Sequence, residues 1–123
     1  KPDDRVVRFA LHDPDHARQA VLDMLATRHP PTAFFATNNR TAVGAAEVLA
    51  DRPEVGLVGF DDFPLADLLQ PRVTVMAQDP AGMGGTAASL VFRRLDGEHW
   101  APAQHIVPVV LIARGSGELP PLP

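Results

Sequence analysis

The stretch TAFFATNNRTAVGAAEVLADRPEVGLVGFDD, residues 32–62, decides the fold of this chain of 123 residues. It contains two apolar runs, 32–36 and 55–60, without the polar alternation of a strand that has one face in water. Such runs are typical of strands in a parallel sheet that is covered on both faces. Between the runs, apolar residues recur at the spacing of one helix face, at positions 42, 43, 46, 49 and 50. The stretch therefore predicts a strand, a helix and a second strand.

The same alternation extends toward the start of the chain. Residues 6–10 read as a short strand, and Asp13-Pro14 supplies a helix N-cap followed by proline at the first helical position. The apolar residues that follow at helical spacing are Ala17, Ala20, Val21, Met24 and Leu25. His29-Pro30-Pro31 ends this helix before the strand at 32–36.

Toward the end of the chain, a short helical piece is expected at 65–69 and a strand at 73–76. Asp79-Pro80 repeats the cap-then-proline signature and starts a helix that runs to about Leu95. Residues 105–114 form a last apolar strand, and Pro108 within it indicates an edge or a crossing point because proline cannot donate to a ladder. Residues 115–123 read as a frayed, proline-rich tail. Alternating strands and helices predict a three-layer α/β/α parallel sheet.

Composition narrows the function classes. The chain has no cysteine, which excludes a disulfide scaffold and a thiolate metal site. Its net charge of -4 argues against wrapping nucleic acid or an anionic membrane through bulk charge, so small molecules and proteins are the expected partners. No apolar run approaches the roughly 18 residues that span a bilayer, and the cytoplasm is the default compartment. Because the chain begins at Lys1 without a signal segment or initiator Met, we expect it to start inside a longer protein.

Polar side chains follow each predicted strand. They are His12-Asp13, Thr37-Asn38-Asn39, Asp61-Asp62 and Gln78-Asp79. In open α/β sheets ligands bind outside the carboxyl ends of the strands, and amide, carboxylate and imidazole groups suit the hydroxyls of a sugar or nucleoside.

Some of these residues have a purely structural explanation. Asp13, Asn39 and Asp79 stand where helix N-caps are expected, and we interpret them as caps. Asn38 and Asp61 come directly after a buried strand, and Gln78 precedes its cap. We interpret these three residues as ligand contacts.

Other chemistries fit the sequence less well. Adjacent Asp61-Asp62 suggests a cation site of the kind found in phosphorelay receiver domains, but such a domain needs a lysine after a later strand, and the only lysine is Lys1. The run 82–87 matches a dinucleotide-binding pattern formally, yet it lies in the first turns of a helix that Asp79 already caps. His12 and His16 lack a third metal ligand nearby, and no serine lies in a nucleophile elbow. We expect no metal, no cofactor and no enzymatic activity.

These residues also resemble a known family. From about Asp13 to the tail, the sequence is similar to the lactose and galactose repressor (LacI/GalR) family of bacterial transcription regulators. The segments that carry the resemblance are 31–39, 42–45, 58–62, Leu65-Ala66, Pro71, Thr74, Gln78, Gly84, Ala87-Ala88, Leu95, Gly97 and Arg114-Gly115-Ser116.

The resemblance implies part of a type I periplasmic-binding-protein-like domain, in which two α/β subdomains enclose a small-molecule effector. Residues 1–78 and 104–115 would belong to the C-terminal subdomain, 79–103 would return to the N-terminal subdomain, and 116–123 would form the tail. The chain would then be the C-terminal part of an effector-binding and dimerisation domain. The helix from Pro80 to Leu95 would pack on residues that this sequence lacks.

The resemblance also implies roles for single residues. Asn38 and Asp61 match family positions that bind effector hydroxyls or base atoms, and Gln78 matches a position at the crossover between subdomains. His12 stands where the family often has an aromatic residue against the ligand. Val43 and Leu69 match positions on the dimer surface of some members.

The mechanism implied is a shift between subdomain arrangements on effector binding, passed through a homodimer to operator DNA. The helix-turn-helix that reads DNA in this family is not found in the sequence, so DNA contact would require an N-terminal segment outside it. The alternative function is the periplasmic sugar-binding protein of an ABC transporter. An upstream DNA-binding segment would decide for the regulator, and a signal peptide would decide for the transporter.

Overall fold

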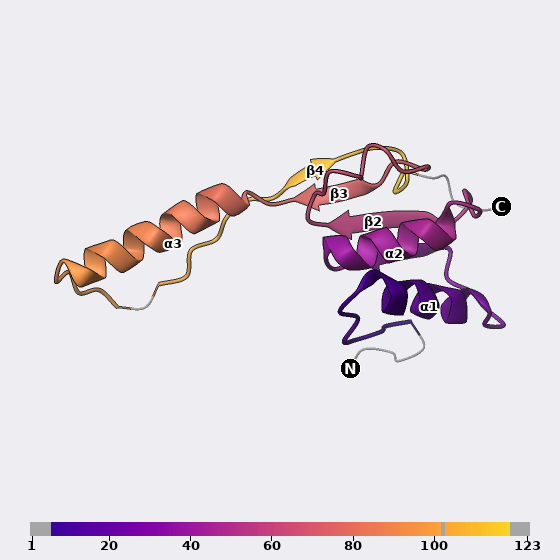
Figure 1. The fold of residues 1–123 in the computed structure, drawn as a ribbon, viewed down its shortest axis with the longest axis horizontal. Helices are drawn as coiled ribbons and strands as arrows, with labels where there is room; N and C mark the ends of the chain where they lie inside the picture. The colour runs from indigo at the N-terminus through magenta and orange to yellow at the C-terminus, as the bar shows by residue number, and fades with distance from the viewer. Residues whose placement is uncertain (1–5, 102, 119–123) are drawn as a thin grey trace. The chain divides into compact units, whose positions relative to one another are not determined.

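A four-stranded sheet with the order β1-β2-β3-β4 organises the structure, a computed structural model that describes residues 6–101 and 103–118 (Figure 1). The strands are β1 (Ala33–Ala36), β2 (Gly56–Phe60), β3 (Thr74–Ala77) and β4 (Val110–Ile112). β1 pairs with β2 and β2 with β3 in parallel, with Phe34 opposite Leu57 and Val58 opposite Thr74. The predicted parallel pairing is confirmed for β1, β2 and β3.

Two helices join this sheet. Helix α1 (Pro14–Leu25) begins after Asp13, whose carboxylate accepts the His16 backbone N–H as predicted for an N-cap. Helix α2 (Asn39–Leu49) begins one residue earlier than predicted. Asn38 is its N-cap, and the Asn38 side chain and Thr41 close a reciprocal capping box. The interpretation of Asn39 as the cap is therefore wrong, because the reciprocal bonds with Thr41 are made by Asn38.

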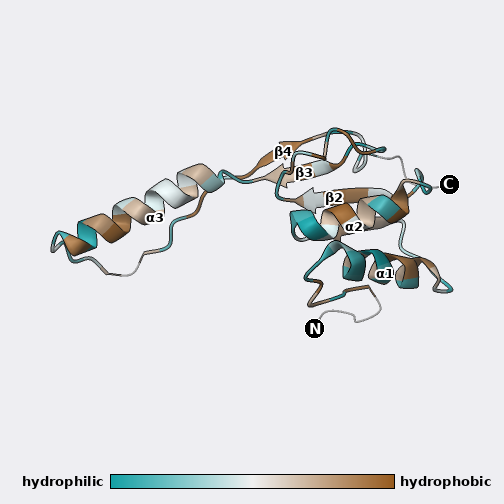
Figure 2. Ribbon diagram, in the orientation of Figure 1, coloured by the Kyte–Doolittle hydropathy of each residue, from teal (hydrophilic) through white to brown (hydrophobic). Residues whose placement is uncertain are grey.

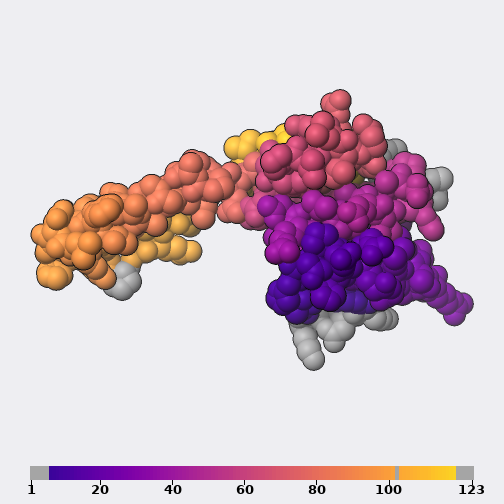
Figure 3. Space-filling model, viewed as in Figure 1, coloured from indigo at the N-terminus to yellow at the C-terminus, as the bar shows by residue number. Residues whose placement is uncertain are grey.

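The core lies where α2 packs on β1 and β2 and α1 packs on α2. Leu49 of α2 and Leu57 of β2 are its largest fully buried side chains. The two helices approach very closely, since a Cβ at Gly44 would collide with the Pro14 carbonyl oxygen. The space-filling view shows the resulting contact between α1, in indigo, and α2, in magenta (Figure 3). Small residues thus let two helices and a sheet form one apolar core.

Contacts divide the chain into two units. Unit 1 comprises Lys1–Ala77 and Leu111–Pro123, and unit 2 comprises Gln78–Val110. The predicted boundaries at 78 and 104, and the assignment of the two parts to different subdomains of a longer protein, stay predictions.

Unit 2 contains helix α3 (Pro80–Leu95), which Asp79 caps as predicted. Apolar residues recur along α3 (Figure 2), but none of its residues is buried. The segment after the helix folds back onto its last turn, where the guanidinium groups of Arg93 and Arg94 lie 5.0 and 5.1 Å from the ring centre of Trp100. Local contacts thus shape this unit.

Several predicted elements differ in the structure. Residues 6–10 form no strand, because they pair with no strand of the sheet, and the last of them, Ala10, is left-handed with φ of 59°. The piece at 65–69 is a series of turns. The last strand covers only 110–112, although β4 lies at a sheet edge as Pro108 indicated. The prediction that both faces of 32–36 are covered is wrong within the described residues, since the Phe35 side chain is 59% exposed.

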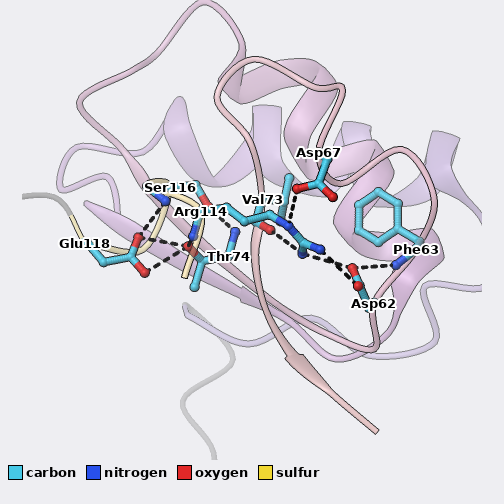
Figure 4. Close-up of polar contacts among 9 residues, drawn as sticks. Asp62, Phe63, Asp67, Val73, Thr74, Arg114, Ser116 and Glu118 are labelled. Carbon is cyan, nitrogen blue, oxygen red and sulfur yellow. Dashed lines mark hydrogen bonds and ion pairs between the residues drawn. The ribbon is translucent and has the colours of Figure 1, made fainter. Parts of the chain in front are cut away.

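The prediction of a frayed tail is wrong for residues 115–118. The Ser116 hydroxyl is buried, accepts the Thr74 backbone N–H at 2.8 Å and donates to the Leu57 carbonyl. The Glu118 carboxylate accepts the Thr74 hydroxyl at 2.8 Å (Figure 4). These bonds attach the end of the chain to β2 and β3. The remainder of the predicted tail, 119–123, lies outside the described residues.

No helix in the described part of the chain is long and apolar enough to cross a membrane.

Candidate ligand-binding site

A cavity of about 320 Å³ opens at the carboxyl end of β1. The segment before α1, the first half of α1, β1 with the residues after it, and the start of α2 surround it. Its polar lining residues are Arg8, His12, Thr37, Asn38 and Thr41, and its other lining residues are apolar. Ligand sites of small polar molecules combine an apolar wall with a few polar groups in this way.

Two of the four predicted effector residues, His12 and Asn38, line this cavity. The Asn38 side-chain oxygen is already engaged, because it accepts the Thr41 backbone N–H at 2.9 Å. Its amide nitrogen makes no hydrogen bond with the residues that the structure describes, so it can donate to a ligand oxygen. The exposed His12 imidazole can donate, accept or stack. Asn38 thus caps a helix and also presents a donor to the cavity, so one residue has both a structural and a ligand-binding role.

Asp61 stands at the carboxyl end of the neighbouring strand β2 and does not line the cavity. Its backbone is left-handed, with φ of 72°, and its N–H donates to the Met76 carbonyl at 3.0 Å. Asp61 and Ala10 are the two non-glycine residues with positive φ in the described chain, and Ala10 lines the cavity. Backbone conformations of this kind cost free energy and cluster at functional sites. The sequence carries no signal for either conformation.

Gln78 is the first residue of unit 2 and is half-buried. The structure therefore brings His12 and Asn38 to one cavity and places Asp61 at the end of the next strand, while Gln78 is described with the other unit. The two predicted dimer residues, Val43 and Leu69, are half-buried and pack against the core of unit 1.

The residue that sequence reasoning missed is Arg114. Only 8% of its side chain is exposed, and both of its terminal nitrogens bind the Asp62 carboxylate, at 2.9 and 3.0 Å. Its Nε donates to Asp67 at 2.6 Å, and Nη1 also donates to the Val73 carbonyl at 3.1 Å (Figure 4). A buried guanidinium requires such partners. An arginine that ends an apolar strand was the available signal.

The hydrogen bonds between Arg114 and Asp62 favour the charged forms of both side chains. The hydrogen bonds from Arg114 hold the pKa of the Asp62 carboxyl below its ordinary value, and those bonds in turn raise the pKa of the guanidinium. Asp62 is therefore a structural carboxylate and not an available cation ligand. The described residues contain no cluster of three or more side chains suited to hold a metal ion.

Comparison with known proteins identifies the class. The model of the periplasmic binding protein-like domain matches residues 3–117. The GalR transcriptional regulator of Escherichia coli K12 is 29% identical over 124 residues, which is 97% of this chain and 36% of that protein. The GalR regulator of Salmonella typhimurium LT2 is 32% identical over 123 residues, covering 95% and 36%. This chain therefore spans about a third of these relatives.

Among solved structures, the transcriptional regulator CelR in complex with cellobiose superimposes with a TM-score of 0.83 at 26% identity, over 95% of this chain and 37% of that one. The chain thus belongs to the periplasmic binding protein-like domain family. Within that family it corresponds to part of the effector-binding domain of LacI/GalR-type regulators, as the resemblance implied. The similar proteins named here are transcription regulators and not enzymes or transport proteins.

Proposed function

We propose that this chain is the ligand-sensing part of a LacI-type regulator that binds a sugar or a similar small polar effector. The observation that carries this proposal is the cavity at the end of β1, because two residues chosen from the sequence alone, His12 and Asn38, line it. Its volume of about 320 Å³ is in the range of small-molecule sites. CelR, a regulator of similar fold, was solved with a disaccharide.

Each proposed contact has a distinct chemical role. The Asn38 amide donates to a hydroxyl oxygen, the Asp61 carboxylate accepts from hydroxyl hydrogens, and the His12 ring contacts the ligand from the lining of the cavity. Gln78 is a proposed effector contact only because of the family resemblance. These groups bind hydroxyls through hydrogen bonds without making or breaking a covalent bond, and no residue has a proposed catalytic role.

The rest of the proposal concerns the whole protein. A homodimer would form through Val43 and Leu69, and Leu65 and Leu68, in the turns beside Leu69, are exposed. Effector binding would change the affinity for operator DNA, which a helix-turn-helix outside this sequence would contact in the cytoplasm. The periplasmic transporter protein is the weaker alternative, because the relatives in the comparison are regulators.

Replacing Asp61 tests the proposal in the intact protein. A thermal-shift screen with cellobiose, D-galactose, D-ribose, a polyol and adenosine selects the ligand, and calorimetry measures its affinity. Asp61→Ala should weaken binding by about 30-fold or more, the loss expected for a charge-assisted hydrogen bond. Asp51→Ala, at an exposed site after α2, is the matched control and should bind as the wild type does. Unchanged affinity in Asp61→Ala contradicts the assignment of Asp61, and failure of every compound to bind contradicts the proposed ligand class.

A further inference from the structure

The loop that carries Asp61 is bonded to both segments through which the chain passes between its two units. The chain leaves unit 1 after Ala77 and returns at Leu111. The Asp61 N–H donates to the carbonyl of Met76, one residue before the first passage. Asp62 pairs with Arg114, three residues after the second passage. One short loop thus contacts the chain on either side of unit 2.

Of these two contacts, the ion pair of Asp62 with Arg114 constrains the loop more than the hydrogen bond of Asp61 with Met76. A guanidinium that meets a carboxylate with two parallel bonds fixes the plane of that carboxylate as well as its distance. The remaining donors of Arg114 bind Asp67 and the Val73 carbonyl, so the guanidinium itself cannot rotate. Asp62 also accepts the backbone N–H of Phe63 at 2.9 Å. The carboxylate of Asp62 is therefore held from two sides, and little freedom is left to the residue before it.

The backbone conformation of Asp61 depends on contacts made by its neighbours. Its left-handed backbone is disfavoured for any residue other than glycine, although aspartate tolerates it better than most. Without an anchor at the next residue, the loop could relax toward an ordinary conformation, and the direction of the Asp61 side chain would change with it. A shift of this kind displaces a ligand-binding oxygen without any change in the apolar core.

We propose that Arg114 is a positioning residue of the effector site, which holds Asp62 and thereby sets the direction of the Asp61 carboxylate. This inference rests on the proposed function, since it concerns the same site. It assigns to the strongly bound Arg114-Asp62 pair a role in affinity beyond its role in stability. It also means that Arg114, just after β4, links the end of that strand to the effector site within unit 1.

A comparison of two isosteric variants in the intact protein tests the proposal. Asp62→Asn and Asp67→Asn each remove one carboxylate from Arg114, but only Asp62 adjoins Asp61. We expect Asp62→Asn to weaken binding of the sugar selected in the screen by about tenfold, and Asp67→Asn to weaken it by less than about threefold. Urea denaturation checks that both variants fold. Equal effects of the two variants on affinity overturn the proposal, because they are the result of a merely structural ion pair.

A second arm shows whether the effect passes through Asp61. In an Asp61→Asn background, Asp62→Asn should add almost no further loss, since the group that it positions is gone. Full additivity of the two losses overturns the proposal. Arg114→Lys should repeat the affinity loss of Asp62→Asn, because a lysine cannot hold both carboxylates in one plane. Wild-type affinity in Arg114→Lys also overturns it.

Failure of the inference and failure of the proposed function give different results. If the wild type binds none of cellobiose, D-galactose, D-ribose, the polyol and adenosine, the proposed function fails and the inference fails with it. If the wild type binds one of them and Asp61→Ala weakens binding while Asp62→Asn does not, the proposed function stands and only the positioning role is wrong.

Discussion

Helices α1 and α3 begin with the same sequence signal, but one face of α1 is buried and α3 is exposed. Each has an aspartate N-cap followed by proline, and each carries apolar residues at helical spacing. Four residues of α1 are buried, whereas none of α3 is. The difference shows that local sequence is enough to form a helix, but that burial requires a second apolar surface. Unit 1 contains that surface, and the described part of unit 2 does not.

The polar contacts follow the same division. In unit 1, Arg114 is almost completely buried and binds its two carboxylates and a backbone carbonyl. In unit 2, the pair of Arg93 with Glu98 is about half exposed on both sides. Water and salt weaken the second pair far more than the first. Unit 1 is thus held by long-range contacts and unit 2 by local ones.

The largest predicted effect concerns leucine truncation. Leu57 of β2 is 1% exposed, and Leu95 is 75% exposed at the end of α3. Leu57→Ala should lower the free energy of unfolding by about 3 kcal/mol through lost burial and a cavity. Leu95→Ala should change it by less than about 0.5 kcal/mol. Urea denaturation of this chain measures both, and a similar loss in both variants would contradict the difference between the units.

Glycine replacement should have opposite signs in the two units. Gly44→Ala forces α1 and α2 apart and should cost about 2 kcal/mol, because the backbone of Pro14 occupies the space of the new methyl group. Nothing lies within 4 Å of a Cβ at Gly84. Gly84→Ala should therefore favour α3 by up to about 1 kcal/mol and raise the helical circular dichroism signal. A loss of helix in Gly84→Ala would show that α3 has a close neighbour.

The smallest predicted effect is a pH dependence of stability. The pKa of Asp62 is lower in the folded chain than in the unfolded chain. Its stabilising contribution is therefore complete above the unfolded value near 4 and disappears as the pH falls through the folded value. Because this side chain is partly exposed, the contribution should be at most about 1 kcal/mol.

Variants of the two arginines isolate this contribution. Arg114→Leu should flatten the loss of stability below pH 4, and Arg93→Leu should leave it nearly unchanged in 0.5 M salt, where exposed pairs are screened. Denaturation midpoints between pH 2 and 6 measure the effect. An equally steep acid limb in Arg114→Leu would show that other carboxylates cause it.

Helix starts and central strands were predictable because their signals are local. Asp13-Pro14 and Asp79-Pro80 begin helices as expected, and the apolar runs around Phe34 and Leu57 form the neighbouring parallel strands β1 and β2. The predicted strand at 6–10 failed because a strand also needs a neighbour to pair with. The tail prediction failed because the role of Ser116 depends on Leu57 and Thr74, which lie 59 and 42 positions away in the sequence.

The candidate site was predictable only in part. Asn38 could be chosen because it lies just after the apolar run that forms β1, and the carboxyl ends of parallel strands meet at one edge of a sheet. His12 was a predicted contact through the family resemblance, and the strand expected before it does not form. The left-handed backbone of Asp61 and the pairing of Asp62 with Arg114 could not be chosen in this way. Both depend on later segments of the chain that folding brings to this loop, at Met76 and at Arg114.

The sequence by itself determined the alternation of strands and helices, the helix caps and the row of polar residues after the strands, because these follow from side-chain chemistry within a few positions. The tertiary structure alone decided which helix is buried and that the last described residues are bonded to the sheet. It also decided that Arg114 holds the loop beside Asp61. The partners of a buried charge are the groups that folding packs around it. Because these groups are distant in the sequence, local sequence patterns cannot predict them.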